Sequence, residues 1–346
     1  MPKVSICVPN LNTRPFLEER FETIFKQTFQ DWELIVVDNY SEDGAWEFLQ
    51  EQASREKRMC LSQAPREGLY ANWNNCIRQA RGEYVYIATS DDTMAPDCLE
   101  KLVAALDAHP ECEMAHCSLK EIDEQGRDIG DWWFTSSTFA NSAPDMLRRR
   151  HIRRAPLDGV LHMGAKSVYI SITQLLIRRT LFERVGGFES RWGSIGDFNW
   201  NMRAALVAST VHVPDTWGGW RTHSGQATAK VDENTTEHRR LKEEMIENAM
   251  QRSLALLPKA IQGQWWQSLR KHLRQREELK RCLRTRKSRV ARTAKLLVEC
   301  AKGSPIALQY AGWRVRRNPF WCEQSPMTIR RWLGKAGLDN LLVPLE

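Results

Sequence analysis

Apolar runs and amphipathic stretches alternate along the first 110 residues of the chain. The apolar runs are typical of short buried strands, and the stretches between them place apolar side chains at helical spacing. Strands that alternate with helices predict a parallel sheet covered on both faces. The expected strands are VSICV at 4–8, WELIVVD at 32–38 and YVYIA at 84–88, with helices from near Pro15, from Ala45, up to Gly82 and from Pro96.

Polar loops follow these three strands. In an open sheet of this kind, ligands bind outside the carboxyl ends of the strands. Residues 9–12, 38–41 and 90–92 are therefore expected to line one shared cleft, although they lie far apart in the sequence.

The third loop places Asp91 and Asp92 side by side. One interpretation is that Asp92 or a neighbour caps the helix that begins near Pro96. The other is that the pair holds Mg²⁺ or Mn²⁺, which takes one or two carboxylates and completes its shell with water and substrate phosphates. The cation would then hold a diphosphate.

The pattern after residue 115 is less regular. We expect an aromatic loop at DWWFTSSTF (131–139), a strand at SVYISITQLLI (167–177), a turn at VGGFES (185–190) and a helix near DFNWNMRAALVA (197–208). From about residue 231 the pattern is helical and charged. These shifts divide the chain into a domain over 1–230 and a basic helical region over 231–346.

The composition favours a cytoplasmic protein. No apolar run approaches the ~20 residues that span a bilayer, and the N-terminus lacks the pattern of a secretory signal. The nine cysteines are an odd number without a C-x-x-C pair, as in proteins with reduced thiols. His109, Cys112, His116 and Cys117 lie close together, but CEMAHCSL is typical of a strand whose neighbouring residues face opposite sides. Such a strand does not favour a tetrahedral zinc site.

Positive charge gathers in residues 270–292, within a chain of net charge +7. Between Trp265 and Val290, apolar residues fall along one helical stripe with basic residues elsewhere, as in an interfacial helix on an anionic membrane. The alternative is that the stripe packs on the larger domain and the basic face is solvated. A nucleic-acid partner would also suit the charge, but it would leave the acidic pair without a role, and none is expected.

Five stretches together resemble the family 2 glycosyltransferases with a GT-A fold, over about residues 1–228. They are VSICVPNLN, QTFQDWELIVVDNYSEDG, EGLYANWNNCIRQARGEYVYIATSDD, VGGFESRWGSIGDFNW and WRTHSGQAT. The resemblance implies a Rossmann-like, mostly parallel sheet flanked by helices. Residues 1–110 would be its nucleotide-binding half and 111–230 its acceptor-binding half. It also implies an inverting, metal-dependent transfer from a nucleotide-sugar donor, with a UDP-sugar as first choice.

The resemblance assigns the nucleotide site residue by residue. Asp38 matches a contact to base or ribose, and Asn39 stands where many members carry an aspartate that accepts the uracil imide proton. Its amide oxygen would still accept that proton. The other matched positions are Pro9, Asn10 and Asn12 beside the base, Arg66 near the diphosphate, and Asn74 on the following helix.

The metal site follows from the same resemblance. Ser90, Asp91 and Asp92 match the Asp-x-Asp motif, with Thr89 replacing its first aspartate. Asp91 is expected to contact ribose and metal, Asp92 to be the main metal ligand, and His223 to close onto the metal or diphosphate after the donor binds.

Asp197 matches the last acid of the family's Glu-Asp motif, while Gly196 replaces the glutamate. We expect Asp197 to be the general base that deprotonates the acceptor hydroxyl; capping the following helix is its alternative role. The acceptor would be a saccharide or a lipid-linked sugar in surface polysaccharide or lipopolysaccharide synthesis, at the inner face of the plasma membrane if the basic region binds lipid. The departures at 89 and 196 leave a non-catalytic nucleotide-sugar-binding scaffold as the alternative function.

Overall fold

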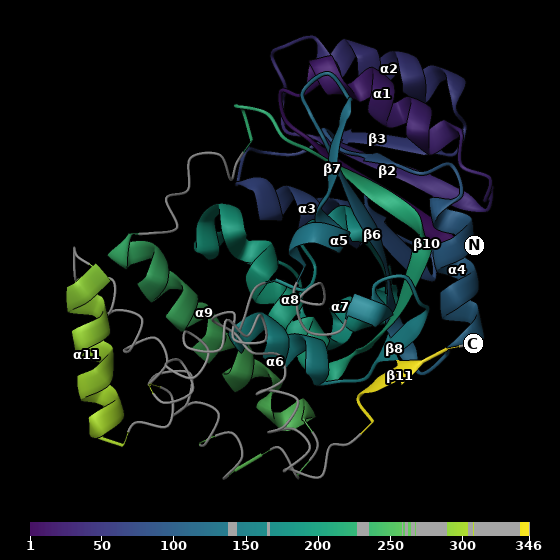
Figure 1. Cartoon of the computed structure of the whole chain (residues 1–346). Helices are drawn as coiled ribbons and strands as arrows, with labels where there is room; N and C mark the ends of the chain where they lie inside the picture. Colours follow the sequence, from purple (N-terminus) through teal and green to yellow (C-terminus); the bar gives the residue numbers. More distant parts are fainter. Residues whose placement is uncertain are drawn as a thin grey trace.

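The computed structural model describes residues 1–137, 144–164, 167–226, 235–257, 289–303 and 340–345, together with residues 259, 262, 263, 267 and 307. Within this part, eleven strands form one mixed sheet with helices on both faces (Figure 1). Along the sheet the order is β11-β8-β10-β6-β9-β4-β1-β2-β3, while β5 pairs with β10 and β7 with β6. The predicted fold class, an α/β sheet flanked by helices, is confirmed.

The first half of the sheet is parallel, as the alternating pattern predicts. It consists of β1 (Val4–Asn10), β2 (Trp32–Asp38), β3 (Met59–Gln63) and β4 (Tyr84–Ile87). The strand β3 was not expected, because MCLSQ contains no long apolar run and lies half-exposed at the edge of the sheet.

Alternation along these strands divides the apolar side chains between two cores. Ile6, Leu34 and Tyr86 face α1 (Arg14–Phe25), α2 (Ala45–Arg55) and α4 (Cys98–Ala108). The neighbouring residues Cys7, Ile35 and Ile87 face the other side. There they pack with α3 (Leu69–Gln79), α6 (Leu157–Gly164), α7 (Arg179–Val185) and α8 (Gly196–Val207).

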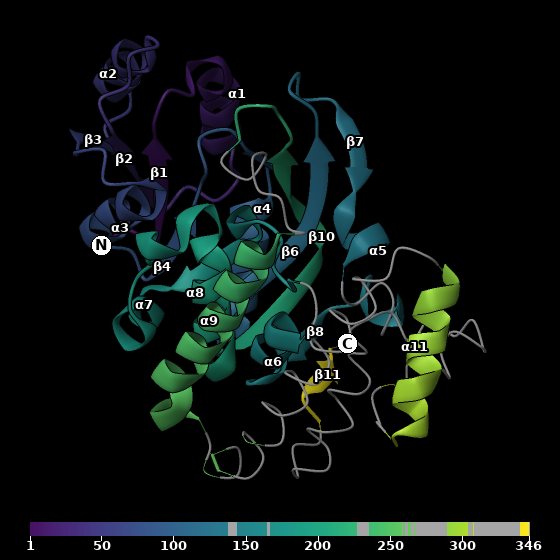
Figure 2. The same ribbon diagram turned by 90° about the vertical axis from the view of Figure 1, so that its left-hand side faces the viewer.

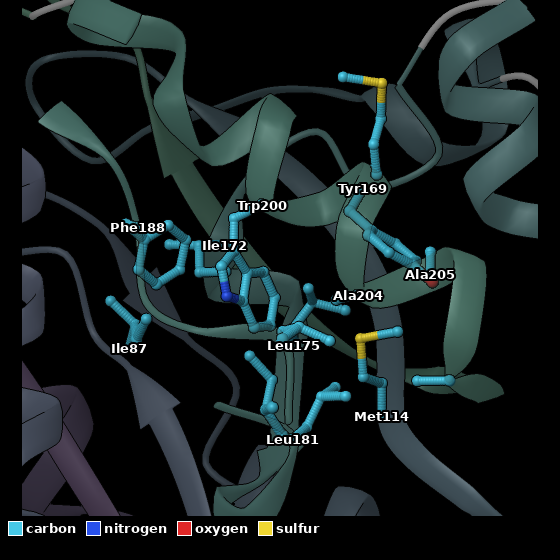
Figure 3. Close-up of a cluster of buried hydrophobic side chains, with 14 of the residues drawn as sticks. Ile87, Met114, Tyr169, Ile172, Leu175, Leu181, Phe188, Trp200, Ala204 and Ala205 are labelled. Carbon is cyan, nitrogen blue, oxygen red and sulfur yellow. The ribbon is translucent and has the colours of Figure 1, made fainter. Parts of the chain in front are cut away.

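The second core centres on Trp200, which lies among Phe188, Ile172 and Leu175 (Figure 3). The indole stacks on Phe182 with ring centroids 4.9 Å apart and donates its Nε1 proton to the carbonyl of Gly186 at 2.9 Å. This bond anchors α8 to the turn at Gly186, where a φ of 78° confirms the turn expected at VGGFES.

The second half of the sheet mixes directions. The long strands β6 (Cys112–Ile122) and β10 (Ser209–Arg221) run parallel, and β9 (Leu175–Arg178) inserts antiparallel between β4 and β6. The strand expected at CEMAHCSL is confirmed within β6. Short strands complete this half: β5 (Thr93–Met94), β7 (Asp128–Asp131) and β8 (His151–Arg153).

Two local expectations are wrong. Only the end of SVYISITQLLI is a strand, because a capping box bends the chain before it: the Ser171 side chain accepts from Thr173, and Gln174 accepts from the Ser171 backbone. The result is the 3₁₀ turn η2 (Ile172–Gln174). The aromatic loop instead contains a short helix, α5 (Trp132–Ser136), whose first turn is capped by the carboxylate of Asp131. The remaining 3₁₀ turns are η1 (Pro144–Met146), η3 (Ser190–Ile195) and η4 (Leu254–Leu256).

Among the residues described after position 230, α9 and β11 contact the sheet domain. The helix α9 (Thr236–Ser253) packs beside α8 (Figure 2) and buries Met245, Ala249 and Met250 in the second core. The strand β11 (Leu342–Pro344) then pairs antiparallel with β8. This region was expected to be helical, and β11 departs from that expectation.

The helix α11 (Arg289–Ala301) lies apart from the sheet in both views (Figures 1 and 2). Most of the amphipathic stretch 265–292 lies outside the described residues, so its predicted membrane contact stays a prediction. Within the described residues, no helix combines the length and apolar character that crossing a bilayer requires.

Candidate active site

The carboxyl ends of β1 and β2 meet at one edge of the sheet, where Asn10 pairs in register with Asp38. Hydrogen bonds join the loops that follow these strands. Asn10 Nδ2 donates to Asp38 Oδ1 at 2.7 Å, and the backbone N–H of Asn12 donates to Ser41 Oγ at 2.9 Å. The first two polar loops therefore lie together, as their position after parallel strands predicts.

Asp38 is fully buried beneath these loops. Its carboxylate accepts hydrogen bonds from the Ser41 backbone and hydroxyl, at 2.9 and 2.5 Å, as well as from Asn10. Asp38 thus organises the rim, and the direct contact to base or ribose expected of it stays a prediction. Pro9 is also buried, whereas Asn12 is exposed and accepts from the Glu42 backbone at 2.9 Å.

Asn39 presents its oxygen rather than its amine. Its Nδ2 donates to the carbonyls of Ala64 and Pro65, at 2.8 and 3.1 Å. These bonds commit both amide protons, so the remaining Oδ1 can act only as an acceptor. Arg66 stays on the loop itself, where it donates to the Asn39 carbonyl at 2.9 Å and to Glu42 at 2.6 Å.

The helix α3 carries one predicted residue that does not face the rim. Both ends of the Asn74 amide bind the Phe188 backbone, at 2.8 and 3.0 Å, so Asn74 fixes the turn before η3. Asn72, which the sequence did not single out, donates instead to the carbonyls of Asn10 and Val37, at 3.3 and 3.0 Å. The contact to the rim is therefore made two residues before the expected position.

Asp91 follows β4 and His223 follows β10, and the structure brings these two side chains together. The distance from His223 Nε2 to Asp91 Oδ2 is 3.1 Å, and the side chains are 10% and 23% exposed. Phe16 of α1 packs on the imidazole with ring centroids 4.7 Å apart. The structure therefore brings together Asp91 and His223, two of the three residues expected to bind the metal. A carboxylate oxygen and an imidazole nitrogen lie side by side at the carboxyl ends of the strands.

Asp92 points the other way and is 2% exposed. Its carboxylate accepts from the backbone N–H of Arg221 at 2.9 Å, from Ser171 Oγ at 3.3 Å, and from the Thr89 hydroxyl. Burial, reinforced by the nearby charge of Asp91, raises the pKa of Asp92 to about 7. The interpretation of Asp92 as a helix cap is wrong, because the next helix begins at Cys98 and Asp97 occupies its cap position.

Arg221 holds this acidic loop in place. The side chain is 1% exposed, and its Nε donates to the Asp91 carbonyl at 2.6 Å. Its Nη1 binds the carbonyls of Asp123 and Glu124, and its Nη2 forms an ion pair with Glu19 at 2.5 Å. One arginine thus links β10, the turn after β6, helix α1 and the Asp91–Asp92 loop.

Asp197 lies in the first turn of α8, half-buried, with its Oδ1 2.8 Å from the hydroxyl of Tyr70. Burial raises the pKa of Asp197, and the hydrogen bond from Tyr70 acts in the opposite direction. The helix-cap interpretation of Asp197 is wrong, because Ile195 occupies the cap position. Tyr70 and Asn72 lie two residues apart on α3, so this helix joins Asp197 to the rim.

A divalent cation fits the donor atoms at the edge. Asp91 offers a carboxylate and His223 an imidazole, whereas the oxygens of Asp92 are already used by protein donors. Among the residues that the structure describes, no three His, Cys, Asp or Glu side chains converge on one point. Two protein ligands with the remaining positions left to phosphate and water are what Mg²⁺ and Mn²⁺ sites usually have.

Tyr70, Asn72 and Ser171 are among the residues at this site that the sequence did not reveal. Tyr70 and Asn72 lie in a helical pattern where an aromatic or amide side chain is most often explained by packing. Ser171 lies inside an apolar run that was interpreted as strand. The sequence spacing between Ser171 and Gln174 is that of a capping box, and it was the one signal that the sequence offered for this turn.

Comparison with known proteins shows which families and structures the chain is similar to. Residues 5–157 match the family model for glycosyl transferase family 2. The uncharacterized glycosyltransferase EpsJ of Bacillus subtilis (strain 168) is 27% identical over 188 residues, which are 53% of this chain and 50% of EpsJ. The GalNAc(5)-diNAcBac-PP-undecaprenol beta-1,3-glucosyltransferase of Campylobacter jejuni is 34% identical over 105 residues, 30% of this chain and 34% of that enzyme. The chain thus spans half or less of the length of these two relatives.

Solved structures share the fold at low identity. The mannosyltransferase PcManGT of Pyrobaculum calidifontis, in complex with GDP-Man and Mn²⁺, has a TM-score of 0.52 and 19% identity, over 98% of this chain and 87% of that one. S. aureus TarS in complex with UDP-GlcNAc also has a TM-score of 0.52, with 16% identity over 78% and 79%. Residues 5–157 are thus similar to glycosyl transferase family 2, and the two solved structures share the fold of this chain.

Proposed function

We propose that the protein is an inverting glycosyltransferase that moves a sugar from a nucleoside-diphosphate donor to the hydroxyl of a saccharide or lipid-linked acceptor in surface polysaccharide synthesis. The observation that carries this proposal is the pairing of Asp91 with His223 at the sheet edge, while Asp197 is tied through α3 to the same edge. The name of the Campylobacter relative, which describes a glucosyltransferase acting on an undecaprenol-linked sugar, supports the lipid-linked class of acceptor.

UDP is our first choice of nucleotide. Asn39 offers an acceptor whose amine is committed to Ala64 and Pro65, and an acceptor at this point suits the imide proton of uracil. TarS in complex with UDP-GlcNAc supports this choice, whereas PcManGT in complex with GDP-Man makes GDP the alternative to test.

Asp91 and His223 would hold the divalent cation. When bound, the cation neutralises charge on the leaving diphosphate. We assign Asp91 rather than Asp92 as the carboxylate ligand, because Asp92 is buried and bonded to Arg221, Thr89 and Ser171. Asp92 and Arg221 then fix the loop from which Asp91 projects.

Asp197 would accept the proton of the acceptor hydroxyl. Burial raises the pKa of Asp197 toward neutral pH. A general base works best when its pKa lies near the pH of the reaction. The acceptor oxygen then attacks the anomeric carbon as the bond to the diphosphate breaks, and attack from the opposite face inverts the anomeric configuration. The O–H bond of the acceptor is exchanged for one on Asp197.

Thermal unfolding with UDP, GDP or dTDP, each with and without MnCl₂, tests donor binding. One nucleotide is expected to raise the melting temperature by several degrees, but only when Mn²⁺ is also present. A ligand that binds the folded state alone stabilises it in this way. A matched variant, Asp91→Asn, should lose this effect. Absence of stabilisation by all three nucleotides would contradict the proposed donor class.

Turnover of the corresponding nucleotide sugars tests catalysis separately from binding. Asp197→Asn is expected to lower kcat by at least about 100-fold, within the range typical of a lost general base, while the donor still binds. Full turnover in Asp197→Asn would remove Asp197 from the mechanism. Donor binding without turnover in the unmodified protein would indicate a scaffold instead of an enzyme.

A further inference from the structure

The hydroxyl of Tyr70 lies between two acceptor atoms. Its oxygen is 2.8 Å from Asp197 Oδ1 and 3.0 Å from the backbone carbonyl oxygen of Ser194. A phenol has one proton to donate. Tyr70 can therefore satisfy an ionised Asp197 or the Ser194 carbonyl, but it cannot satisfy both at once.

We propose that Tyr70 is a positioning residue for Asp197, which holds the carboxylate in its proton-accepting orientation and reverses its hydrogen bond when that carboxylate takes up a proton. This inference rests on the proposed function of Asp197 as the base. It adds a partner whose chemistry is matched to both protonation states of that base.

The exchange needs no net proton transfer from the tyrosine. While Asp197 is ionised, the Tyr70 hydroxyl donates to Oδ1. Once the carboxylate has taken the acceptor's proton, the new Asp197 hydroxyl donates to the Tyr70 oxygen, and Tyr70 turns its own proton to the Ser194 carbonyl. Asp197 is hydrogen-bonded to Tyr70 in both states, so the base meets the same partner before and after the transfer.

Packing fixes the phenol in this position. Tyr70 is 2% exposed, its ring stacks on Phe188 at 5.8 Å between centroids, and it meets Trp73 edge-on at 5.1 Å. Burial, together with the charge of Asp197, raises the pKa of the phenol well above its ordinary value. Tyr70 consequently keeps its proton and acts as a donor.

Gly196 provides the room that this ring requires. A Cβ at position 196 would lie 2.7 Å from Tyr70 Cε2 and 2.8 Å from the Glu189 carbonyl oxygen, distances that real Cβ atoms do not show. A side chain at 196 and the ring of Tyr70 therefore exclude each other.

The charged groups on the surrounding elements are engaged elsewhere. Glu189 binds Arg191 at 2.7 Å and the indole of Trp192 at 3.1 Å, and forms an ion pair with Arg252 of α9. Lys242 of α9 lies over the ring of Phe198, 5.6 Å from its centroid. Tyr70 of α3 thus supplies the side-chain hydrogen bond that Asp197 receives.

The test compares Tyr70→Phe with Tyr84→Phe. The control removes a hydroxyl that binds Asp107 on the opposite side of the sheet, far from the proposed base. The pKa of Asp197 is measured by ¹³C NMR of the carboxyl group in aspartate-labelled protein, with Asp197→Asn identifying the signal. The pH dependence of kcat, measured with the nucleotide sugar that the thermal-unfolding screen identifies, gives a second readout.

Tyr70→Phe is expected to raise the pKa of Asp197 by about one unit. The acidic limb of the kcat–pH profile should move to higher pH by the same amount, and the KM for the donor should not change. The direction follows because a hydrogen bond to an ionised group is about twice as strong as one between neutral groups. Tyr84→Phe should leave both readouts unchanged. An unaltered Asp197 pKa or an unaltered acid limb in Tyr70→Phe would overturn the proposal. Since the NMR titration needs no turnover, it decides the role of Tyr70 even if Asp197→Asn retains activity and the assigned base is wrong.

Discussion

Asp91 and Asp92 are neighbours in the chain, but their carboxylates have different surroundings. Asp91 is 23% exposed and meets His223, whereas Asp92 is 2% exposed and fills its acceptor positions with Arg221, Thr89 and Ser171. The two acids look like one metal motif in the sequence, but their roles differ. Asp91 is partly exposed and available to a metal, whereas Asp92 is buried and holds the loop through its hydrogen bonds.

Substituting each acid in turn separates these tasks. Asp91→Asn is expected to abolish Mn²⁺-dependent nucleotide binding and to leave the unfolding free energy unchanged or higher, because the repulsion between the two carboxylates is removed. Asp92→Asn is expected to lower the unfolding free energy by about 1–3 kcal/mol, since an amide N–H₂ would face buried donors. Urea unfolding and calorimetric titration measure the two effects, and equal behaviour of the two variants would contradict the division.

Part of this site follows from the family resemblance of the sequence. The resemblance assigned Asp91 and His223 to one metal site, and the structure places their side chains 3.1 Å apart, while their role as metal ligands stays a prediction. It could not distinguish the orientation of Asp91 from that of Asp92, which depends on the backbone of Arg221 in a strand 129 residues away. Nor could it reveal that Tyr70, one position into α3, bonds to an acid 127 residues later.

At the level of elements, β6, β8 and β10 carry a buried network of histidines. Gln174 Oε1 accepts from the Ile170 backbone at 2.9 Å, so its amine faces His116 Nε2 at 3.0 Å. His116 must accept there, and its proton therefore lies on Nδ1, 3.0 Å from His212 Nδ1. His212 can then donate from Nε2 to the Leu147 carbonyl at 3.3 Å. His116 and His212 each hold one proton. A second proton on His116 would lie on Nε2 and face the amine of Gln174, which is itself a donor.

This network predicts that the protein loses stability in mild acid. Burial lowers the pKa of four histidines: to about 3 for His151 and His162, and well below the ordinary 6.5 for His116 and His212. Below pH 6.5 the unfolded chain therefore binds more protons at these positions than the folded one, and the unfolding free energy falls as pH falls. The raised pKa values of Asp92 and Asp197 act with the opposite sign and offset up to two of the four protons.

The expected loss is about 3 kcal/mol between pH 6 and pH 5, at about 1.4 kcal/mol for each net proton per pH unit. Urea unfolding at pH 7.5, 6.0 and 5.0 measures it. A pH-independent unfolding free energy would show that the histidines exchange protons freely in the folded state.

The alternation of strand and helix was sufficient to predict β1, β2 and β4, because each of these apolar runs is buried on both faces, but it missed the half-exposed β3. It was insufficient for residues 167–177, where Ser171 and Gln174 form a cap inside an apolar stretch. Local hydrogen bonding between side chain and backbone decided that segment, and apolar periodicity contains no information about it.

For the molecule as a whole, the sheet includes residues on both sides of position 230, from β1 to β11 (Leu342–Pro344). The pattern predicted a boundary near residue 230, but α9 contributes to the second core and β11 forms the edge of the sheet beside β8. A three-residue strand near a terminus, with one proline, gives too weak a signal to be recognised from sequence.

Ending the chain after Asn340 should therefore weaken the sheet. Val343 and Leu345 pack against the first core, and Ile152 of β8, which is 3% exposed, would lose its cover. The unfolding free energy is expected to fall by about 2 kcal/mol, on the scale of one buried aliphatic side chain. Removal of Glu346 alone is the control in urea unfolding, and equal stability of the two forms would show that β11 contributes nothing.

Residues 270–292 contain eleven lysines and arginines against two glutamates, so their charge exceeds the +7 of the whole chain. We expect the protein to co-sediment with vesicles containing phosphatidylglycerol, but not with phosphatidylcholine alone, and to dissociate at high salt. Replacing Arg281, Arg284, Arg286 and Lys287 with glutamine should abolish the binding while leaving β11 intact. Binding that persists in this variant would assign the contact to another surface.

Because α9 packs in the second core and β11 pairs with β8, the chain between Ser253 and Leu342 begins and ends on the same sheet domain. A chain held at both ends stays within the reach that its length allows. The basic residues 270–292 are therefore kept within a bounded distance of the sheet, whatever conformation this stretch adopts. An anionic surface that binds them is held within the same distance.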